Sequence, residues 1–385
     1  MTVANVEEIV KERYREGARS QVPELCCPID YDPRYLEVIP EEVLARDYGC
    51  GDPSRYVRPG ETVLDLGSGT GKICFIAAQV VGVEGRVIGV DMTSEMLEVA
   101  RHNAPIVAAE LGYANVEFRR GRIQDLQLDL DRLGLELDTN PVTDVEGLLA
   151  VRAREEALRS EAPLVTDDSI DVVVSNCVLN LVKNNQKQQL FAEIYRVLKR
   201  GGRAVISDIV CDETVPQALQ EDTELWSGCI SGALTEEGFL AAFEKAGFYG
   251  VRILERAEEP WRTVEGIEFR SLTIEAFKGT DGPCFERRQA VIYRGPFKEV
   301  LDDDNHRLRR GQRYAVCDKT YQLYRQEPYG QFFEFIVPRE EIALEDAEPF
   351  DCARDVTRSP RETKGQDYEL TSEEGGPCCG PDDCC

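Results

Sequence analysis

Four cysteines stand where an α/β enzyme usually places its reactive side chains. Cys50 lies in "DYGCG", and Cys74 follows a glycine-rich turn. Cys177 ends the apolar run "DVVVSNC", and Cys229 lies in the loop segment "LWSGCISGAL". Any one of them alone reads as a small buried hydrophobe. Four cysteines that converge on one edge of a sheet predict instead a thiolate site for a soft, thiophilic acceptor.

The segment "LDLGSGTG" predicts a ligand-binding turn between a strand and a helix. Gly67, Gly69 and Gly71 permit a tight turn and a close backbone approach to a ligand at the helix N-terminus. The spacing differs from the dinucleotide pattern G-x-G-x-x-G. Asp91 ends the next strand, where it can hold the hydroxyls of a ribose, and Met92 can lie against an adenine. A nucleotide-binding sheet of another kind, such as that of an NAD-dependent dehydrogenase, is the alternative.

This loop, Asp91 and the strand–helix rhythm around them resemble the S-adenosylmethionine site of the seven-strand methyltransferases. The resemblance implies S-adenosylmethionine as the cofactor. The cofactor contacts that it implies are Asp65, Gly67, Ser68, Gly69, Gly71, Asp91, Met92, Ile123 and Asn176. Cys74 lies in the first helical turn after the loop, where the helix dipole favours a thiolate, although packing in the core explains it about as well.

The elements that must position these residues alternate between strand and helix. Apolar strands are predicted in "TVLDL", "RVIGVD", "VEFRRGRI", "SIDVVVSN" and "RAVISDIV", with helices between them. Alternation of this kind predicts a parallel sheet covered on both faces. Two later runs, "GVRILERAE" and "EFRSLTIEAFK", predict an antiparallel edge. The predicted fold class is therefore α/β, a Rossmann-like seven-stranded methyltransferase domain with a small α+β C-terminal domain and a flexible Cys-rich tail.

Composition shifts along the chain divide it into successive regions. The predicted regions are a helical arm at 1–45, the methyltransferase domain at 46–250 with a rim insertion at 125–166, a small domain at 251–345, and a flexible acidic Cys-rich tail at 346–385. The insertion is longer than an ordinary connection, and its function is left open.

Charge and cysteine content narrow the classes of function. The 385 residues carry a net charge of -27, which argues against binding to nucleic acid or to anionic membranes. Neither a signal peptide nor an apolar run of the roughly 18 residues that span a bilayer is evident, so a cytoplasmic protein is expected. In a reducing compartment, 14 cysteines indicate free thiols, ligands or redox pairs rather than structural cross-links. His102 and His306 stand in weak contexts, which disfavours a His-rich metal site or a histidine base.

Taken together, "YGCG", "DLGSGTGKIC", "GVDM", "SNCVLNL", "LWSGCISGAL" and the terminal "GPCCG" resemble the arsenite methyltransferases. The resemblance implies that three thiolates, at Cys74, Cys177 and Cys229, hold trivalent arsenic, As(III). The arsenic lone pair then attacks the S-adenosylmethionine methyl group. Cys50 would be the fourth cysteine, for disulfide exchange or early capture. The nucleophile carries no proton, so the reaction needs no general base.

The same resemblance implies a set of partners. Arsenite and methylated arsenicals are the expected substrates, arriving as glutathione or other thiol conjugates. Thioredoxin or glutathione is the expected reductant of a disulfide formed between rounds, and a monomer is expected. Two alternatives stay open: a methyltransferase for a small organic molecule with cysteines used in packing, and a metalloid-sequestering protein, which leaves the cofactor loop unexplained.

The remaining cysteines form two further groups. Those near the two chain ends are expected to capture arsenic or to be incidental: Cys26, Cys27, Cys378, Cys379, Cys384 and Cys385. The others are expected to be structural or incidental: Cys211, Cys284, Cys317 and Cys352.

Overall fold

The computed structural model describes residues 6–19, 29–46 and 48–371. The chain forms two compact units, which meet in sequence at Gly279 and Thr280. The predicted boundary at residue 250 is not where the chain divides. The strands that follow it complete the large sheet of the first unit, because their apolar side chains are buried in that core. Within the described ranges, none of the helices combines the length and the apolar character that crossing a bilayer requires.

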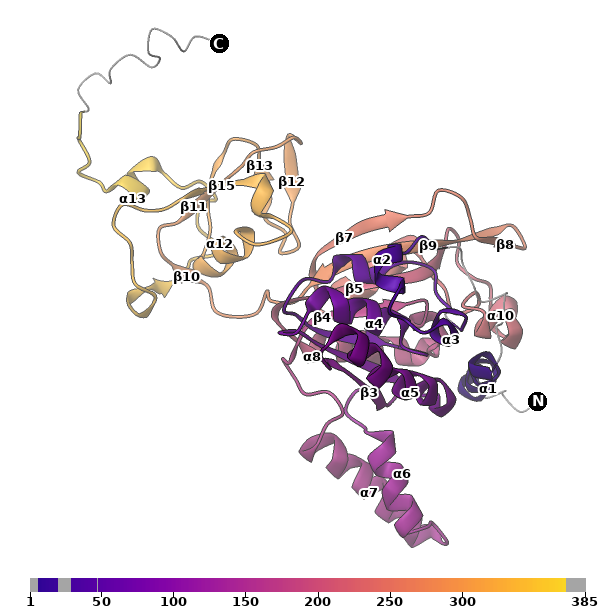
Figure 1. Ribbon diagram of the computed structural model, residues 1–385. Coiled ribbons are helices and arrows are strands. Elements are labelled where there is room, and N and C mark those ends of the chain that lie inside the picture. Colours follow the sequence, from indigo (N-terminus) through magenta and orange to yellow (C-terminus); the bar gives the residue numbers. More distant parts are fainter. Residues whose placement is uncertain (1–5, 20–28, 47, 372–385) are drawn as a thin grey trace. The chain divides into compact units, whose positions relative to one another are not determined.

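A mostly parallel sheet forms the centre of the first unit (Figure 1). Its strand order is β3-β2-β1-β4-β5-β9-β7, with β9 antiparallel to both of its neighbours and β6 and β8 added at the margins. This is the predicted seven-strand arrangement with an antiparallel edge. The strands are β1 (Thr62–Leu66), β2 (Arg86–Asp91), β3 (Val116–Arg120), β4 (Ile170–Asn176), β5 (Leu198–Cys211), β6 (Leu234–Thr235), β7 (Tyr249–Arg256), β8 (Arg262–Val264) and β9 (Ile267–Phe277).

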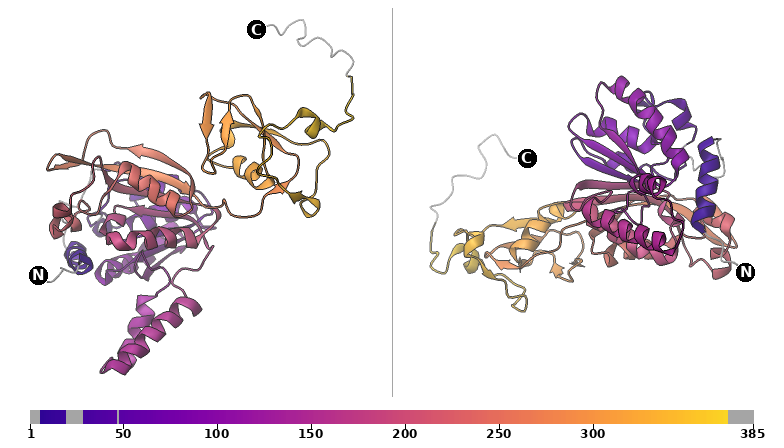
Figure 2. Two further views of the ribbon diagram at one scale, coloured as in Figure 1. Left: turned by 180° about the vertical axis from the view of Figure 1, so that it is seen from behind. Right: turned by 90° about the horizontal axis from the view of Figure 1, so that it is seen from below.

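Helices cover both faces of this sheet (Figure 2). Successive strand residues point to opposite faces, so Val63 packs into one apolar cluster and Leu64 into the other. The cluster around Val63 contains side chains of α4 and α5, and the cluster around Leu64 contains side chains of α8 and α11. The helices are α4 (Lys72–Val81), α5 (Ser94–Leu111), α8 (Lys187–Val197), α9 (Gln217–Gln220), α10 (Thr223–Ser227) and α11 (Glu236–Lys245).

The N-terminal segment contributes helices that pack on this core. They are α1 (Val6–Arg19), α2 (Pro33–Leu36) and α3 (Glu41–Leu44), followed by a 3₁₀ turn, η2 (Pro53–Tyr56). Helix α1 contacts α10 and α5, which lie beyond different strands of the sheet. An ion pair of 2.7 Å from Arg15 to Glu95 fixes α1 on α5, and Arg13 donates to the Ser227 hydroxyl at 2.7 Å on α10.

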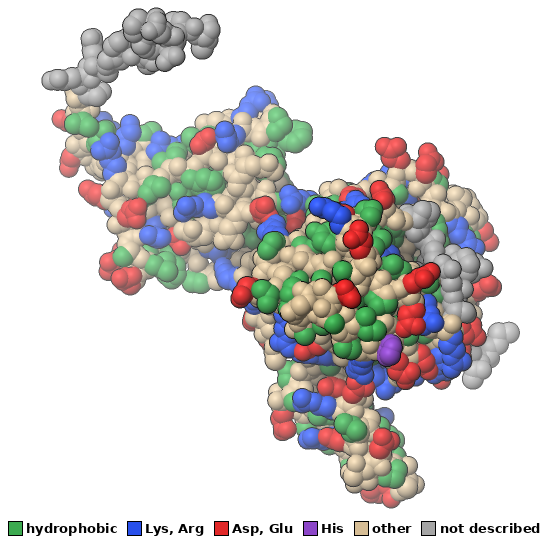
Figure 3. Space-filling model, in the orientation of Figure 1, with side chains coloured by type: hydrophobic (Ala, Val, Ile, Leu, Met, Phe, Trp, Pro, Cys, Tyr) green, Lys and Arg blue, Asp and Glu red, His purple; other side chains and the backbone are tan. Residues whose placement is uncertain are grey.

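The predicted insertion forms a helical hairpin between β3 and β4, α6 (Leu130–Thr139) and α7 (Val145–Glu161). Its first half is helical, because Leu133 packs with Leu128 and Leu158 in a small cluster of their own. The hairpin carries charged side chains of both signs beside exposed apolar ones (Figure 3). An ion pair of 2.9 Å from Arg159 to Asp125 anchors its end.

The second unit is a small α+β fold. A three-stranded antiparallel sheet, β14-β11-β15, packs with aromatic side chains around helix α12. Its elements are β10 (Phe285–Glu286), β11 (Ala290–Tyr293), β12 (Glu299–Leu301), β13 (Arg307–Arg309), β14 (Arg313–Ala315), α12 (Asp318–Tyr324), β15 (Phe333–Ile336), β16 (Glu348–Pro349) and α13 (Pro360–Lys364).

Part of the segment expected to be a flexible tail is folded. Between residues 346 and 371 the chain adds β16 and α13 to the second unit. Arg358 is 1% exposed and is bonded to Glu286 at 2.8 Å and to Glu362 at 2.9 Å. Charged residues that pair with each other can be buried, which composition alone does not reveal. The remaining tail, including its four cysteines, lies outside the described residues, as do Cys26 and Cys27.

Candidate active site

A cleft opens at the carboxyl ends of β1, β2 and β4, the usual place for a ligand in an open α/β sheet. It encloses about 1040 Å³ of empty space, counting the part open to solvent. Most of the predicted cofactor residues line it: Asp65, Gly67, Ser68, Gly69, Asp91, Met92, Ile123 and Asn176. Gly71 is not among the lining residues. It supplies a turn of φ 95° packed against Phe118, where a Cβ would come within 2.6 Å of the ring.

The glycine loop leaves space for a ligand. Gly67 and Gly69 have φ values of 72° and 53°, a left-handed conformation that glycine adopts at little cost. A Cβ on Gly69 would meet open space, and the buried Ser68 hydroxyl has no hydrogen-bond partner. Asp91 braces the loop by accepting from the Gly69 amide at 3.0 Å and from the Thr93 amide at 2.7 Å. An unsatisfied hydroxyl beside an open, braced loop fits a polar ligand such as S-adenosylmethionine.

The structure brings Cys50, Cys177 and Cys229 together next to this cleft. The Cys229 thiol donates to the Cys177 carbonyl at 3.1 Å, and the sulfurs of Cys50 and Cys177 lie within 4.8 Å of each other. Cys177 itself lines the cleft. The cluster therefore lies where a substrate held by sulfur can meet a bound cofactor.

Local backbone geometry positions the three cysteines of this cluster. Cys177 and Cys229 both have φ of 62°, a conformation that residues other than glycine rarely adopt and that often marks functional positions. Cys50 is held by Asn176, whose side-chain oxygen accepts from the Cys50 amide at 2.9 Å and from the Gly51 amide at 3.1 Å. A Cβ on Gly49 would lie 2.3 Å from the Asn176 amide nitrogen, so the glycine beside Cys50 permits this close approach.

Cys74 is not part of the cluster. Its side chain is fully buried between α4 and the sheet, where its sulfur packs against Gly89 of β2 and donates to Asp65 at 3.2 Å. The predicted trio of Cys74, Cys177 and Cys229 is therefore not assembled, and Cys50 takes the third place. Burial raises the pKa of the Cys74 thiol and the Asp65 carboxylate raises it further, which outweighs the expected helix-dipole effect.

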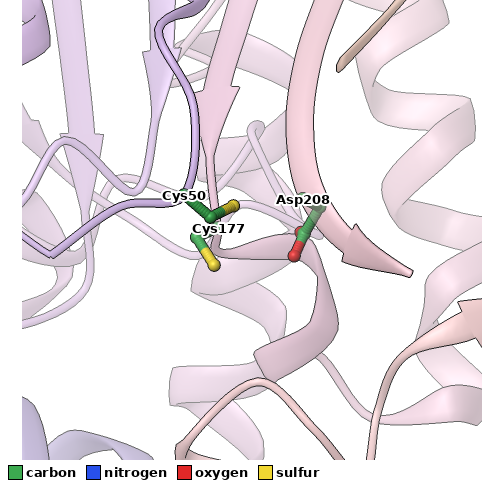
Figure 4. Close-up of side chains that lie close together, drawn as sticks. All are labelled: Cys50, Cys177 and Asp208. Atoms are coloured by element: carbon green, nitrogen blue, oxygen red, sulfur yellow. The ribbon is translucent and has the colours of Figure 1, made fainter. Parts of the chain in front are cut away.

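A carboxyl group completes the surroundings of the thiols. Asp208 of β5 lies with Cys50 and Cys177 in a group whose potential ligand atoms are all within 4.8 Å of one another (Figure 4). Burial raises the pKa of Asp208 to about 6. Its carboxylate accepts from the Leu179 amide and the Asn180 side-chain amide, each at 2.8 Å, so it also orders the loop that follows Cys177.

The thiols are protonated at neutral pH. The hydrogen bond from Cys229 lowers the pKa of Cys177, but the hydrogen bond to Cys50 and burial outweigh it, so that this pKa lies well above its usual value. For Cys229, the hydrogen bond to Cys177 and then burial raise the pKa. The expected thiolates are therefore neutral thiols in the absence of a substrate.

The N-terminal helix closes one side of the site, a contribution that the sequence did not predict. Glu7, Val10 and Tyr14 of α1 line the cleft, and the Tyr14 hydroxyl bonds to Cys229. Burial, and then the charge of Cys229, raises the pKa of Tyr14 well above its usual value. The available signal was the amphipathic pattern of "VEEIVKERYREGA", which indicates a packed helix but not the surface it covers.

The chain is similar to known methyltransferases. A methyltransferase domain family matches residues 58–138 and 146–247, and a family described as a domain of unknown function (DUF8838) matches residues 280–368. An arsenite methyltransferase of Aquipseudomonas alcaligenes is 33% identical over 81% of this chain and 84% of its own length. The chain belongs to the arsenite methyltransferase family.

Two other arsenite methyltransferases extend the likeness. The mouse arsenite methyltransferase is 30% identical over 90% of this chain and 86% of its own length. The crystal structure of an arsenic(III) S-adenosylmethionine methyltransferase from Chlamydomonas reinhardtii matches 84% of this chain and 100% of its own, with 29% identity and a TM-score of 0.55. This arsenite methyltransferase therefore uses S-adenosylmethionine as its cofactor.

Proposed function

We propose that Cys50, Cys177 and Cys229 bind trivalent arsenic and hold it beside S-adenosylmethionine for methylation. The observation that carries this proposal is the meeting of three thiols from distant segments at the cleft that Cys177 lines. Soft sulfur ligands match a soft metalloid. We assign the cofactor to the glycine loop, with Ser68 and Asp91 as its polar contacts.

Arsenic binding needs no prior ionisation of the thiols. As each As–O bond of arsenous acid breaks and an As–S bond forms, the thiol proton leaves with the hydroxyl as water. Three exchanges release three water molecules and leave no net charge in the buried site. Neutral thiols suit this exchange, since three buried thiolates without partners would carry a large desolvation cost.

The role of the chain in the transfer is to position the arsenic. S-adenosylmethionine, when bound, supplies an electrophilic methyl group. Three sulfur ligands leave the arsenic with its lone pair, so the side chains need not remove a proton. Holding two reacting groups in place can by itself contribute ~7–11 kcal/mol to lowering a barrier.

The cluster can also return electrons to the arsenic. Methyl transfer formally raises arsenic to the pentavalent state. If two of its sulfur ligands leave as a disulfide, two electrons return to the arsenic, which becomes trivalent again. Cys177 lies next to both Cys50 and Cys229, so it is placed for a disulfide with either. Glutathione or thioredoxin then reduces that disulfide by thiol exchange.

The same chemistry suggests the setting in which the enzyme works. We propose that arsenite and methylated arsenicals reach the site as glutathione or other thiol conjugates, that the protein acts as a monomer, and that it acts in the cytoplasm, where thiols stay reduced.

Cysteine replacement tests the ligand set. Cys50→Ser, Cys177→Ser and Cys229→Ser should each lower methylation of arsenite by about 100-fold or more, because the arsenic loses a ligand that positions it. Products are separated and quantified after incubation with S-adenosylmethionine, arsenite and glutathione. Two controls should stay within about threefold: Cys74→Ala, and Cys211→Ser in the same apolar cluster as the trio. Loss with Cys74→Ala and retention with Cys50→Ser would reverse the assignment, and retention in all three serine variants would favour an organic substrate.

A further inference from the structure

A second group of cysteines, expected to be structural or incidental, meets in the C-terminal unit. Cys284 directly precedes β10, and Cys352 lies three residues after β16. These strands pair antiparallel, Phe285 opposite Pro349, and the Phe350 amide donates to the Cys284 carbonyl at 2.8 Å. The pairing brings two segments that are far apart in sequence side by side, each with a thiol.

A third segment adds Cys317. The residue after it, Asp318, forms an ion pair of 2.8 Å with Arg287, just beyond β10. The Cys317 thiol lies close enough to Cys284 to raise the pKa of the Cys284 thiol. The Thr320 amide donates to the Cys317 sulfur at 3.4 Å, which fixes the position of that atom. The Cys352 thiol donates to the carbonyl of Phe350 at 3.8 Å, on the residue whose amide bonds to Cys284.

Access and protonation distinguish the members of this cluster. Cys317 is buried, Cys284 is partly exposed and Cys352 is exposed, so a small solute can reach the pair from one side. Burial, and then the hydrogen bond to Cys317, raises the pKa of Cys284 to about 11. Cys284 is therefore a neutral thiol at physiological pH. The two sulfurs are preorganised, but a neutral thiol is a poor ligand for ions that require thiolates.

The donor set argues for one class of ligand. Structural zinc sites take four ligands in tetrahedral geometry. Among the described residues, the group of three potential metal ligands within 4.8 Å of one another is Cys50, Cys177 and Asp208, and the C-terminal cysteines do not form such a group. Two neighbouring thiols with a third thiol farther away fit a ligand atom that binds two sulfurs and can also bind a third.

We propose that Cys284 and Cys317 form a second binding site for trivalent arsenicals, a dithiol site, and that Cys352 supplies a third sulfur to arsenite. With a monosubstituted arsenical, two As–O bonds break, two As–S bonds form, and the thiol protons leave with the hydroxyls as two water molecules. The oxidation state of arsenic does not change. The choice of arsenic as ligand rests on the proposed function, since a soft metalloid is the solute that this enzyme handles.

Stoichiometry of a simple arsenical tests the proposal. Phenylarsine oxide is added to the full-length protein under reducing conditions, and bound equivalents are counted by native mass spectrometry. Cys284→Ser/Cys317→Ser should bind one equivalent fewer than the wild type, and Cys211→Ser, also a buried cysteine, should bind the same number. An unchanged count in the double variant overturns the proposal.

Two further measurements keep the test decisive. Non-denaturing digestion of the loaded wild-type protein should yield a peptide pair bridged through Cys284 and Cys317, which needs no variant to fold; bridges found only elsewhere overturn the site. Cys177→Ser/Cys229→Ser should separately lose one equivalent. If that loss fails while the C-terminal loss occurs, the proposed function falls and the dithiol site stands.

Discussion

The two thiol clusters of this chain differ in their backbone conformation and in the residues that surround them. In the first unit, Cys177 and Cys229 occupy left-handed backbone positions, and Cys177 lines the cofactor cleft beside Asp208. In the second, Cys284 and Cys317 sit at the ends of short regular elements, held by strand pairing and by one ion pair. The backbone of the first cluster is strained and lies beside the glycine-loop cleft, whereas the backbone of the second cluster adopts ordinary conformations.

This difference indicates that both clusters can bind an arsenical, whereas only the first is placed to support methyl transfer. Two or three neighbouring thiols are sufficient to exchange with the hydroxyls of an arsenical, and both clusters offer that. Methyl transfer additionally requires the arsenic to be held within reach of a donor, and the residues that arrange this surround the first cluster alone among those described here: Asn176, the glycine loop and Asp91. Backbone strain at Cys177 and Cys229 is consistent with that extra demand.

Among the substitutions that test this comparison, Asn176→Ala is expected to lower activity most. It removes the side-chain oxygen that accepts from the Cys50 and Gly51 amides, so Cys50 should drift from Cys177. We expect kcat for arsenite methylation to fall by about 10–100-fold, as for residues that support metal ligands. Phenylarsine oxide binding at the C-terminal cluster should not change. Asn115→Ala, which removes contacts to the end of α4, serves as the matched control.

The next effect is expected from Asp91→Ala, which changes the cleft and leaves the thiol cluster intact. Loss of its hydrogen bonds to the Gly69 and Thr93 amides frees the loop and removes the proposed ribose contact. KM for S-adenosylmethionine should rise by about 10–100-fold, equivalent to ~1.4–2.7 kcal/mol. The number of phenylarsine oxide equivalents should equal that of the wild type. A reduced number would mean that the cleft and the first cluster are not separable.

The third effect is on stability rather than activity and concerns Asp208, the carboxyl group beside the first cluster. Its pKa of about 6 in the folded protein exceeds the ordinary 3.8. The folded state therefore binds this proton more tightly, and the contribution of Asp208 to stability rises as pH falls from about 6 to about 4, by on the order of 3 kcal/mol.

This contribution should be absent in Asp208→Asn. The comparison uses urea unfolding of both proteins at several pH values, followed by the fluorescence of Trp226 and Trp261, which both lie in the first unit. The difference in unfolding free energy between wild type and variant should grow in favour of the wild type as pH falls through that window. A difference independent of pH would show that Asp208 titrates normally.

Local patterns predicted the sheet and the glycine-rich turn well, because strand alternation, the glycine spacing and Asp91 are features of neighbouring residues. They did not distinguish Cys74 from Cys50. Cys74 follows the loop directly, but the direction of its side chain is set by packing of α4 against Gly89. Cys50 is held at the site by a hydrogen bond from its amide to Asn176, 126 positions away. The glycines on either side of Cys50 were the available signal.

The other incorrect or missing predictions also depended on contacts between residues far apart in the sequence. The order of residues 346–371 depends on Arg358, whose partners Glu286 and Glu362 lie in different segments. The role of α1 depends on contacts from Arg13 and Arg15 to α10 and α5. Long-range contacts of charged side chains look like solvated surface in a sequence and become structure only when the partners are known.

The most direct test of the ligand assignment is anomalous diffraction at the arsenic absorption edge from crystals of the full-length protein with arsenite. The account predicts an arsenic peak at bonding distance from the sulfurs of Cys50, Cys177 and Cys229, at the edge of the glycine-loop cleft. A peak bonded to Cys74, or arsenic found elsewhere with these three sulfurs unligated, would contradict it.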